Sequence, residues 1–389
     1  MSSQQDELRI PPNPGGAIPA EHILGRDSLV RELWRHLDQQ SLALFSPRRV
    51  GKTSVLQRMT ALSPEGWEIR SRDLEGLDSP AAFAQYLYED AGGIVGGAKG
   101  GLAKARALVT KLAGSIEIKN VKLTLQDDAW RRLLERLFDD LDEHLAAKDS
   151  KLVFFWDEFT LFIGDVVARG DAKGAMVLLD TLRAARQRHP RIRMVLTGSI
   201  GFHLVIRQLV KAGYGNRPIN DVRAERVPML KPAACNELAA ALLRGIDLRP
   251  DEALVAAVTS ASEGHPFVVQ HLIDRLRGRG SATSQEIKTE LEDLLAPPSV
   301  LDLGHYAERL HRYYGELAEL AVSVLDAVAP HESGLHIDVI ATTLGVDAKA
   351  LVDVLRDLRD DDYLHFENRH ARFALDFVRR HWVNDRMLG

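Results

Sequence analysis

The segment "SLALFSPRRVGKTSVLQRMTAL" at residues 41–62 constrains the fold of this chain more than any other. A short apolar run predicts a strand, a polar loop follows at 46–54, and the apolar residues after it have helical spacing. Backbone N–H groups at the head of a helix attract anions, and the helix dipole adds to that attraction. The segment therefore predicts a phosphate-binding loop in an α/β protein.

Each residue at the end of this loop fits one part of phosphate binding. Gly51 lets the backbone approach the phosphates, Lys52 reaches their oxygens, and the Thr53 hydroxyl is suited to ligate Mg²⁺. Such loops usually open on glycine, whereas this one opens on Ser46. Because the first position needs only a turn away from the strand, Ser46 followed by Pro47 can supply it. The residue roles are expected to survive, while the detailed loop geometry stays open.

Further apolar runs predict strands at 67–74, 151–156 and 191–197, with a weaker one at 222–229. Helical patterns separate these runs, for example at 127–147. Strands that alternate with helices indicate a parallel sheet covered on both faces.

Two carboxylates follow the apolar run in "KLVFFWDEF" at 151–159. Ligands bind at the carboxyl ends of strands in parallel sheets, so this position favours function over a plain helix cap. Asp157 is predicted to hold Mg²⁺ through water, and Glu158 to orient or deprotonate the attacking water. Thr197 and Ser199 end the next run, where a hydroxyl can bind the γ-phosphate or its water. Ordinary turn chemistry explains Thr-Gly-Ser as well.

The remaining segments predict further domains. The proline- and glycine-rich start predicts an extended arm. A glycine-rich stretch at 91–101, followed by alternating polar and apolar residues at 115–125, predicts a flexible insertion. Helical patterns fill 230–297, and "APPS" then breaks the chain. Helices at 315–328, 335–343 and 348–359 and two short strands after them have the rhythm of a winged helix. The predicted division is an arm at 1–20, a core at 21–229 with the insertion at 91–126, a helical lid at 230–300 and a winged-helix domain at 301–389.

Composition narrows the class of protein. A net charge of −5 argues against a dominant nucleic-acid-binding surface. The single cysteine, Cys235, cannot form an internal disulfide and is expected to be buried. The chain starts without an apolar core flanked by positive charge, and no apolar stretch approaches the length of a membrane span. We therefore expect a cytoplasmic protein without a membrane partner.

In order and spacing, several motifs resemble those of P-loop ATPases of the STAND/AAA+ type, especially the archaeal-ATPase-like branch. They are "ILGRD" (23–27), "SPRRVGKTS" (46–54), "FFWDEF" (154–159), "VLTGS" (195–199) and "SEGHPFVVQ" (262–270). The similarity extends from about residue 20 to the C-terminus. It implies an α/β core whose parallel sheet has the order 5-1-4-3-2, followed by an all-helical lid and a winged-helix domain.

The resemblance also implies contacts with a nucleotide. Leu24, Gly25 and Arg26 would lie near the adenine, and Pro266 would touch the base or ribose. The remaining predicted nucleotide-binding residues are Arg49, Val50, Gly51, Lys52, Thr53 and Ser54, and the predicted metal ligands are Thr53 and Asp157.

For each of three arginines, two roles remain open. Arg48 and Arg49 match the family's loop and either contact phosphate or fix the loop to neighbouring carboxylates. Arg217 would act on a neighbour's nucleotide as an arginine finger, or is an ordinary surface arginine. The predicted catalytic set is Lys52, Glu158, Ser199 and Arg217.

These features predict an ATPase that hydrolyses ATP slowly and acts as a molecular switch with Mg²⁺. The guanine-reading pattern Asn-Lys-x-Asp is absent, which favours ATP over GTP. A protein partner or self-association on ATP binding is expected. The alternative is a DNA-associated AAA+ motor or loader. However, residues 346–362 carry three basic and six acidic side chains, which would repel DNA phosphates. DNA is therefore possible as a partner but not favoured.

Overall fold

The computed structural model describes residues 8–95, 105, 107, 129–198, 201–297 and 299–388. Within it the chain forms two compact units. The first contains Met1–Ser28, Ser46–Arg58 and Val227–Gly389, and the second contains Leu29–Phe45 and Met59–Arg226. Most of the insertion predicted at 91–126 lies outside the described residues. Ser199 also lies outside them.

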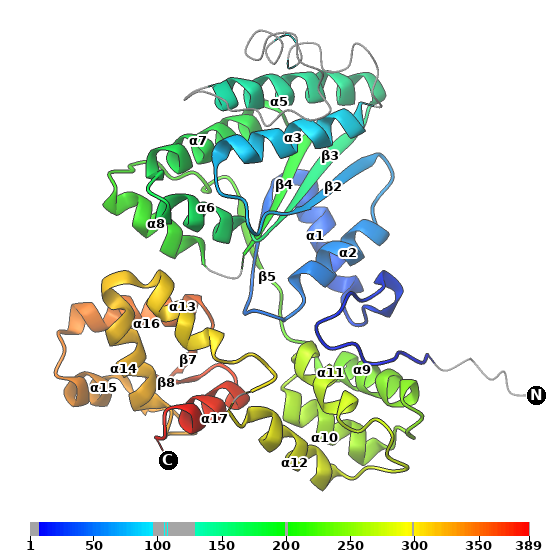
Figure 1. Cartoon of the computed structure of the whole chain (residues 1–389), viewed down its shortest axis with the longest axis vertical. Helices are drawn as coiled ribbons and strands as arrows, with labels where there is room; N and C mark the ends of the chain where they lie inside the picture. The colour runs from blue at the N-terminus through cyan, green and yellow to red at the C-terminus, as the bar shows by residue number, and fades with distance from the viewer. Residues whose placement is uncertain are drawn as a thin grey trace, which may run out of the picture. The chain divides into compact units, whose positions relative to one another are not determined.

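The second unit is built on a five-stranded parallel sheet. Its strands are β1 (Leu42–Phe45), β2 (Trp67–Asp73), β3 (Lys151–Asp157), β4 (Ile192–Gly198) and β5 (Arg223–Arg226). They lie in the order β2-β3-β4-β1-β5, which confirms the predicted order 5-1-4-3-2 (Figure 1). The fold class expected from the sequence is therefore correct.

Helix α1 (Asp27–Gln39) precedes β1, and further helices connect the successive strands. The connecting helices are α2 (Lys52–Ala61), α3 (Pro80–Ile94), α5 (Ala129–Lys148), α6 (Phe159–Ala168), α7 (Ala172–Arg188) and α8 (Phe202–Lys211). Helices α3, α5 and α7 run side by side (Figure 1).

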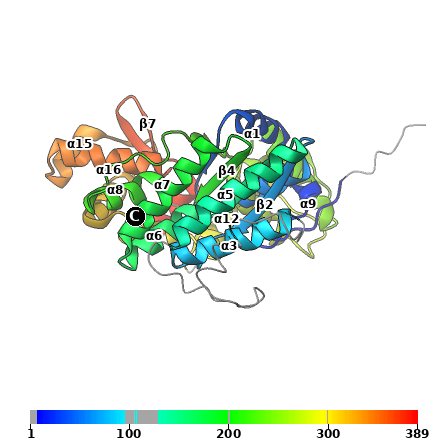
Figure 2. The same ribbon diagram turned by 90° about the horizontal axis from the view of Figure 1, so that it is seen from above.

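The aromatic run of β3 shows how both faces of the sheet are covered. Because successive strand residues point to opposite faces, neighbouring rings in the run meet different helices. Phe155 lies 6.3 Å, between ring centroids, from Trp34 of α1. Trp156 lies 4.9 Å from Phe83 of α3. Figure 2 shows α1 and α3 on opposite sides of the strands. A continuous apolar strand is thus the expected pattern for a sheet buried on both faces.

The first unit is mostly helical. It begins with a short 3₁₀ turn, η1 (Ala20–His22). The segment predicted to be the helical lid contains α9 (Pro232–Gly245), α10 (Glu252–Ser262), α11 (Pro266–Asp274) and α12 (Ser284–Leu295). The C-terminal part contains α13 (His305–Tyr313), η2 (Gly315–Leu317), α14 (Ala318–Val328), β6 (Leu335–His336), α15 (Ile337–Leu344), α16 (Ala348–Asp360), β7 (Leu364–Glu367), β8 (His370–Phe373) and α17 (Asp376–Asp385). Strands β6, β8 and β7 form a small antiparallel sheet.

The N-terminal segment around Ile10 packs on α9. Ile10 is buried, and its N–H donates to the Ala241 carbonyl of α9 at 3.0 Å. A Cβ at Gly245 would lie 1.9 Å from the Ile10 oxygen, so only glycine allows this approach. Cys235 of the same helix is fully buried, as expected from the sequence.

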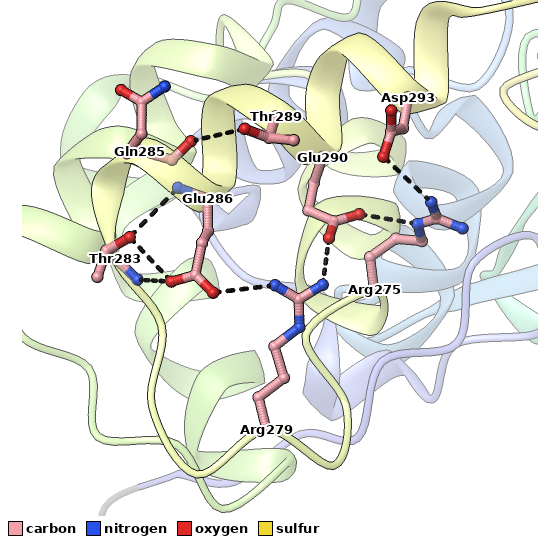
Figure 3. A network of polar contacts seen from close by, with 8 residues as sticks. All are labelled: Arg275, Arg279, Thr283, Gln285, Glu286, Thr289, Glu290 and Asp293. Atoms are coloured by element: carbon pink, nitrogen blue, oxygen red, sulfur yellow. Dashed lines mark hydrogen bonds and ion pairs between the residues drawn. The ribbon is translucent and has the colours of Figure 1, made fainter.

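A network of carboxylates and arginines joins α12 to the segment that precedes it. Glu290 is only 7% exposed and accepts hydrogen bonds from Arg275, at 2.9 Å, and from Arg279 (Figure 3). Thr283 and Glu286 cap the helix in a reciprocal pair of bonds. Burial alone raises the pKa of Glu290, but the bonds from the two arginines outweigh it and leave the pKa lowered.

We expect Glu290→Gln to lower the free energy of unfolding by about 1 kcal/mol at neutral pH, because two charge-assisted bonds weaken and both arginines are partly exposed. A carboxylate with a lowered folded pKa stabilises the fold above its unfolded pKa, and this contribution is lost as the pH falls through the folded value. Urea unfolding at pH 7 and at acidic pH measures the difference. The control is Asp293→Asn, whose exposed carboxylate lies 3.9 Å from Arg275. Equal losses in the two variants would contradict the expectation.

Within the described ranges, no helix is both long enough and apolar enough to cross a membrane.

Candidate functional site

The predicted phosphate loop joins the carboxyl end of β1 to the first residue of α2. Arg49 and Gly51 have positive φ, at 64° and 99°, whereas Ser46 does not. Left-handed backbone is the conformation that favours glycine, and it occurs at the end of the loop rather than at its start. Serine at the first position is therefore compatible with the loop. The Val55 N–H donates to the Gly51 carbonyl at 2.9 Å and begins the helix.

Lys52 lies over the loop that precedes it. Its Nζ donates to the carbonyls of Ser46, at 3.0 Å, and Pro47, at 3.2 Å. The side chain is only 6% exposed, while Thr53 is exposed on the first turn of α2. An ammonium and the N-terminus of a helix are thus combined in one short segment, which is the chemistry that binds phosphate.

Arg26 fixes the backbone of this loop. One guanidinium nitrogen donates to the Val50 carbonyl at 3.0 Å, and the other to Pro228 at 2.7 Å. Burial lowers the pKa of Arg26 to about 10, so it remains charged at neutral pH. Its neighbour Gly25 has φ 70°, and a Cβ there would lie 2.4 Å from the Cβ of Ala234. The family resemblance implied that these residues lie near the adenine, and that stays a prediction. The structure additionally shows that the Arg26 side chain holds the loop.

The start of α11 also contacts the loop. His265 is 3% exposed, and its ring lies close to the backbone of Arg48. Burial lowers the pKa of His265 to about 4, so the ring is neutral at pH 7. Phe267 places its ring 4.3 Å from the Arg49 guanidinium. Pro266, the residue predicted to touch the nucleotide, lies in the sequence between two residues that contact the loop arginines.

Sequence reasoning missed His265 and Phe267 as contacts, although both lie in the motif that it quoted. It also missed Asp302, whose carboxylate is 3.0 Å from Arg49 and 4.0 Å from Arg48. Of the two interpretations kept for these arginines, the contact with a neighbouring carboxylate is present in the structure. No sequence signal links residues 250 positions apart.

In the second unit, the predicted carboxylate and hydroxyl lie together at the carboxyl end of the sheet. Asp157 ends β3 and is 8% exposed, and the Thr197 hydroxyl of β4 donates to it. The Glu158 N–H donates at 3.2 Å both to Asp157 Oδ1 and to Thr197 Oγ1. Thr197 therefore orients Asp157, while Ser199 lies outside the described residues.

Glu158 has left-handed backbone, with φ 52° and ψ 31°, at the junction of β3 and α6. Such a conformation is costly for a residue other than glycine and concentrates at functional sites. The end of β4 also packs closely against α6, since a Cβ at Gly198 would lie 1.8 Å from Thr160 Oγ1. The backbone thus fixes the direction in which the half-buried Glu158 leaves the sheet.

A further carboxylate at this edge escaped the sequence reasoning. Asp73 ends β2 and is the parallel register partner of Asp157. The signal was available, since the predicted strand at 67–74 reaches this aspartate. Arg217 is exposed, and its backbone carbonyl accepts a hydrogen bond from Arg183 at 3.2 Å. Its predicted finger role stays a prediction.

The predicted metal ligands suit magnesium, because hydroxyl and carboxylate oxygens are ligands that this hard cation prefers. Among the residues that the structure describes, no group of three or more His, Cys, Asp and Glu side chains could hold a metal ion. Thr53 and Asp157 as magnesium ligands stay a prediction.

Comparison with solved structures identifies the fold. The Walker-type ATPase PABY2304 of Pyrococcus abyssi superposes with a TM-score of 0.64 and 18% sequence identity, over 93% of this chain and 96% of that one. The ORC2 protein of Aeropyrum pernix, solved as ADPNP–ADP complexes, superposes with a TM-score of 0.52 and 13% identity, over 96% of each chain. The chain thus has the fold of P-loop ATPases. No protein-family model and no curated protein sequence matches it.

Proposed function

We propose that this protein binds ATP with Mg²⁺, hydrolyses it slowly and acts as a molecular switch. The observation that carries the proposal is the connectivity at one edge of the sheet. The loop leaves the carboxyl end of β1 and opens α2 with Gly51, Lys52 and Thr53, while β3 ends at Asp157 two strands away. Ligands bind at this edge in parallel sheets.

The residues of the loop have distinct roles in the proposal. The amides at 49–54 and the Lys52 ammonium bind the phosphates, and Thr53 and Asp157 hold Mg²⁺, the latter through water. Leu24, Gly25 and Pro266 form the adenine side. When bound, Mg²⁺ would neutralise charge on the phosphates.

Glu158 is the proposed general base. Its backbone N–H is bonded to Asp157 and Thr197, so its position is tied to the proposed metal ligand. A carboxylate that is fixed in this way can orient the attacking water and accept its proton. Ser199 and Arg217 are proposed to assist with the γ-phosphate.

The switch role is supported by the contacts of the loop arginines. Arg49 touches Phe267 of the lid and Asp302, which precedes the first C-terminal helix. A change at the loop on nucleotide binding would therefore alter contacts with both segments. This is the arrangement expected of the STAND class of switch, whose state then reaches a protein partner or a second copy.

Calorimetry with Mg-ATP, Mg-ADP and Mg-GTP tests the proposed binding, and phosphate release tests hydrolysis. We expect ATP and ADP to bind, GTP to bind more weakly, and phosphate to be released slowly. Sizing the protein with ADP and with a non-hydrolysable ATP analogue tests nucleotide-dependent assembly. Absence of both binding and phosphate release would reject the ATPase.

The second candidate function is a DNA-associated motor, and two basic segments of the C-terminal part, 367–373 and 377–382, favour it. The structure pairs several of these cations with carboxylates. Arg369 lies 2.6 Å from Asp338, and Arg380 is paired with Glu292. On α16, Arg356 lies 3.3 Å from Asp353. Cations that are already paired have less charge to offer to DNA phosphates.

We therefore expect duplex DNA to leave the rate of ATP hydrolysis unchanged over a titration at low salt. Phosphate release measured against DNA concentration provides the test. A rise that disappears steeply with added salt would favour the motor instead, because counterion release gives DNA binding that signature.

A further inference from the structure

Asp302 places a negative charge beside the loop that is proposed to bind phosphates. Its Oδ2 lies 3.0 Å from Arg49 Nη2 and 4.0 Å from Arg48 Nη1. All three residues belong to the first compact unit. A carboxylate and a phosphate present the same kind of acceptor to a guanidinium, so they compete for it.

The turn that carries Asp302 is held by its own hydrogen bonds. The Asp302 N–H donates to the Ser299 carbonyl at 3.1 Å, and the Ser299 hydroxyl donates to Leu294 at the end of α12 at 2.6 Å. The Asp302 carbonyl accepts from Nδ1 of His305, the first residue of α13. The position of the carboxylate is therefore set by the segment that joins the lid to the C-terminal part.

The arginine that it binds is also positioned from the other side. The Arg49 guanidinium lies over the Phe267 ring, and Arg49 itself has left-handed backbone. Its Nε is buried and has no hydrogen-bond partner among the described residues. Asp302 thus satisfies only part of the donor set of Arg49.

We infer that Asp302 is an internal competitor of the nucleotide phosphates: its carboxylate holds Arg49 and Arg48, and phosphate binding displaces it. This inference rests on the proposed function and deepens it, because it names how the C-terminal part regulates the site. Displacement ends the contact between the loop and the turn at 299–304, which leads directly into α13, so nucleotide binding at the loop changes what holds the start of that helix.

The test compares Asp302→Asn with the wild type. Asparagine tolerates the φ of 56° at this position, so the turn is preserved while the charge is removed. We expect Mg-ATP to bind about 1.5- to fivefold more tightly, the range expected for a partly exposed ion pair. Raising the salt from about 0.05 M to about 0.5 M should shrink the gain, because salt screens exposed charges.

The matched control is Asp338→Asn, which removes the same charge from an exposed ion pair with Arg369 in the same unit. Its affinity for Mg-ATP should equal that of the wild type. If the wild type binds ATP and Asp302→Asn binds with equal or lower affinity, this inference alone is overturned. If calorimetry detects no ATP binding by the wild type or either variant, the proposed function is overturned and the inference with it.

Discussion

Lys52→Ala is expected to abolish ATP binding. The ammonium lies over the loop, bonded to the Ser46 and Pro47 carbonyls, and in the proposed complex it turns to the phosphate oxygens. Loss of two charge-assisted hydrogen bonds costs about 3–6 kcal/mol, which corresponds to at least about a hundredfold weaker binding. Calorimetric titration with Mg-ATP measures this change directly.

Lys349→Ala is the control for this variant, because Lys349 is an exposed lysine near the start of α16. It should bind ATP as the wild type does. The thermal midpoint of Lys52→Ala must also be measured, since the lost loop bonds can loosen the fold without any role in binding. Equal ATP affinity in a folded Lys52→Ala and the wild type contradicts the phosphate-loop assignment.

Glu158→Gln is expected to keep ATP binding and stop turnover. Glutamine has the same shape and leaves the backbone N–H bonds to Asp157 and Thr197 in place, but it cannot accept a proton from water. General-base catalysis contributes about 10²- to 10⁴-fold, so the rate should fall by this factor. Single-turnover phosphate release and calorimetry on the same sample separate the two effects.

The matched control is Glu75→Gln, which changes an exposed carboxylate shortly after β2. Its rate should equal that of the wild type. A Glu158→Gln protein that hydrolyses ATP normally would remove Glu158 from the mechanism, while the binding function would stand. A variant that no longer binds ATP would instead mean that Glu158 contributes to the ground-state complex.

Local sequence was sufficient for the strands that carry the site. The apolar runs before Ser46 and Asp157 predicted β1 and β3, because buried parallel strands need continuous apolar residues. β5 has the weakest signal, since Arg223–Arg226 is largely exposed, and it forms through pairing with β1. The local sequence predicted β5 only weakly, because the strand is stabilised by its pairing with β1.

Long-range contacts at the loop could not be predicted. Arg26 on the Val50 carbonyl, His265 on the Arg48 backbone and Asp302 on Arg49 each join distant parts of the chain. Each contact is made by a common residue type that also serves many other roles. Only folding brings these side chains close to their partners, so no spacing rule reveals them.

The sequence by itself determined the loop, its following helix and the carboxylates at the strand end, because these depend on residues that are adjacent in the chain. The tertiary structure decided the left-handed backbone at Arg49 and Glu158 and the pairing of the loop arginines with Asp302. Hydrophobic periodicity acts over a few residues, whereas electrostatic partners are chosen by proximity in space. Features that depend on neighbouring residues could therefore be predicted, whereas contacts between distant residues had to be observed in the structure.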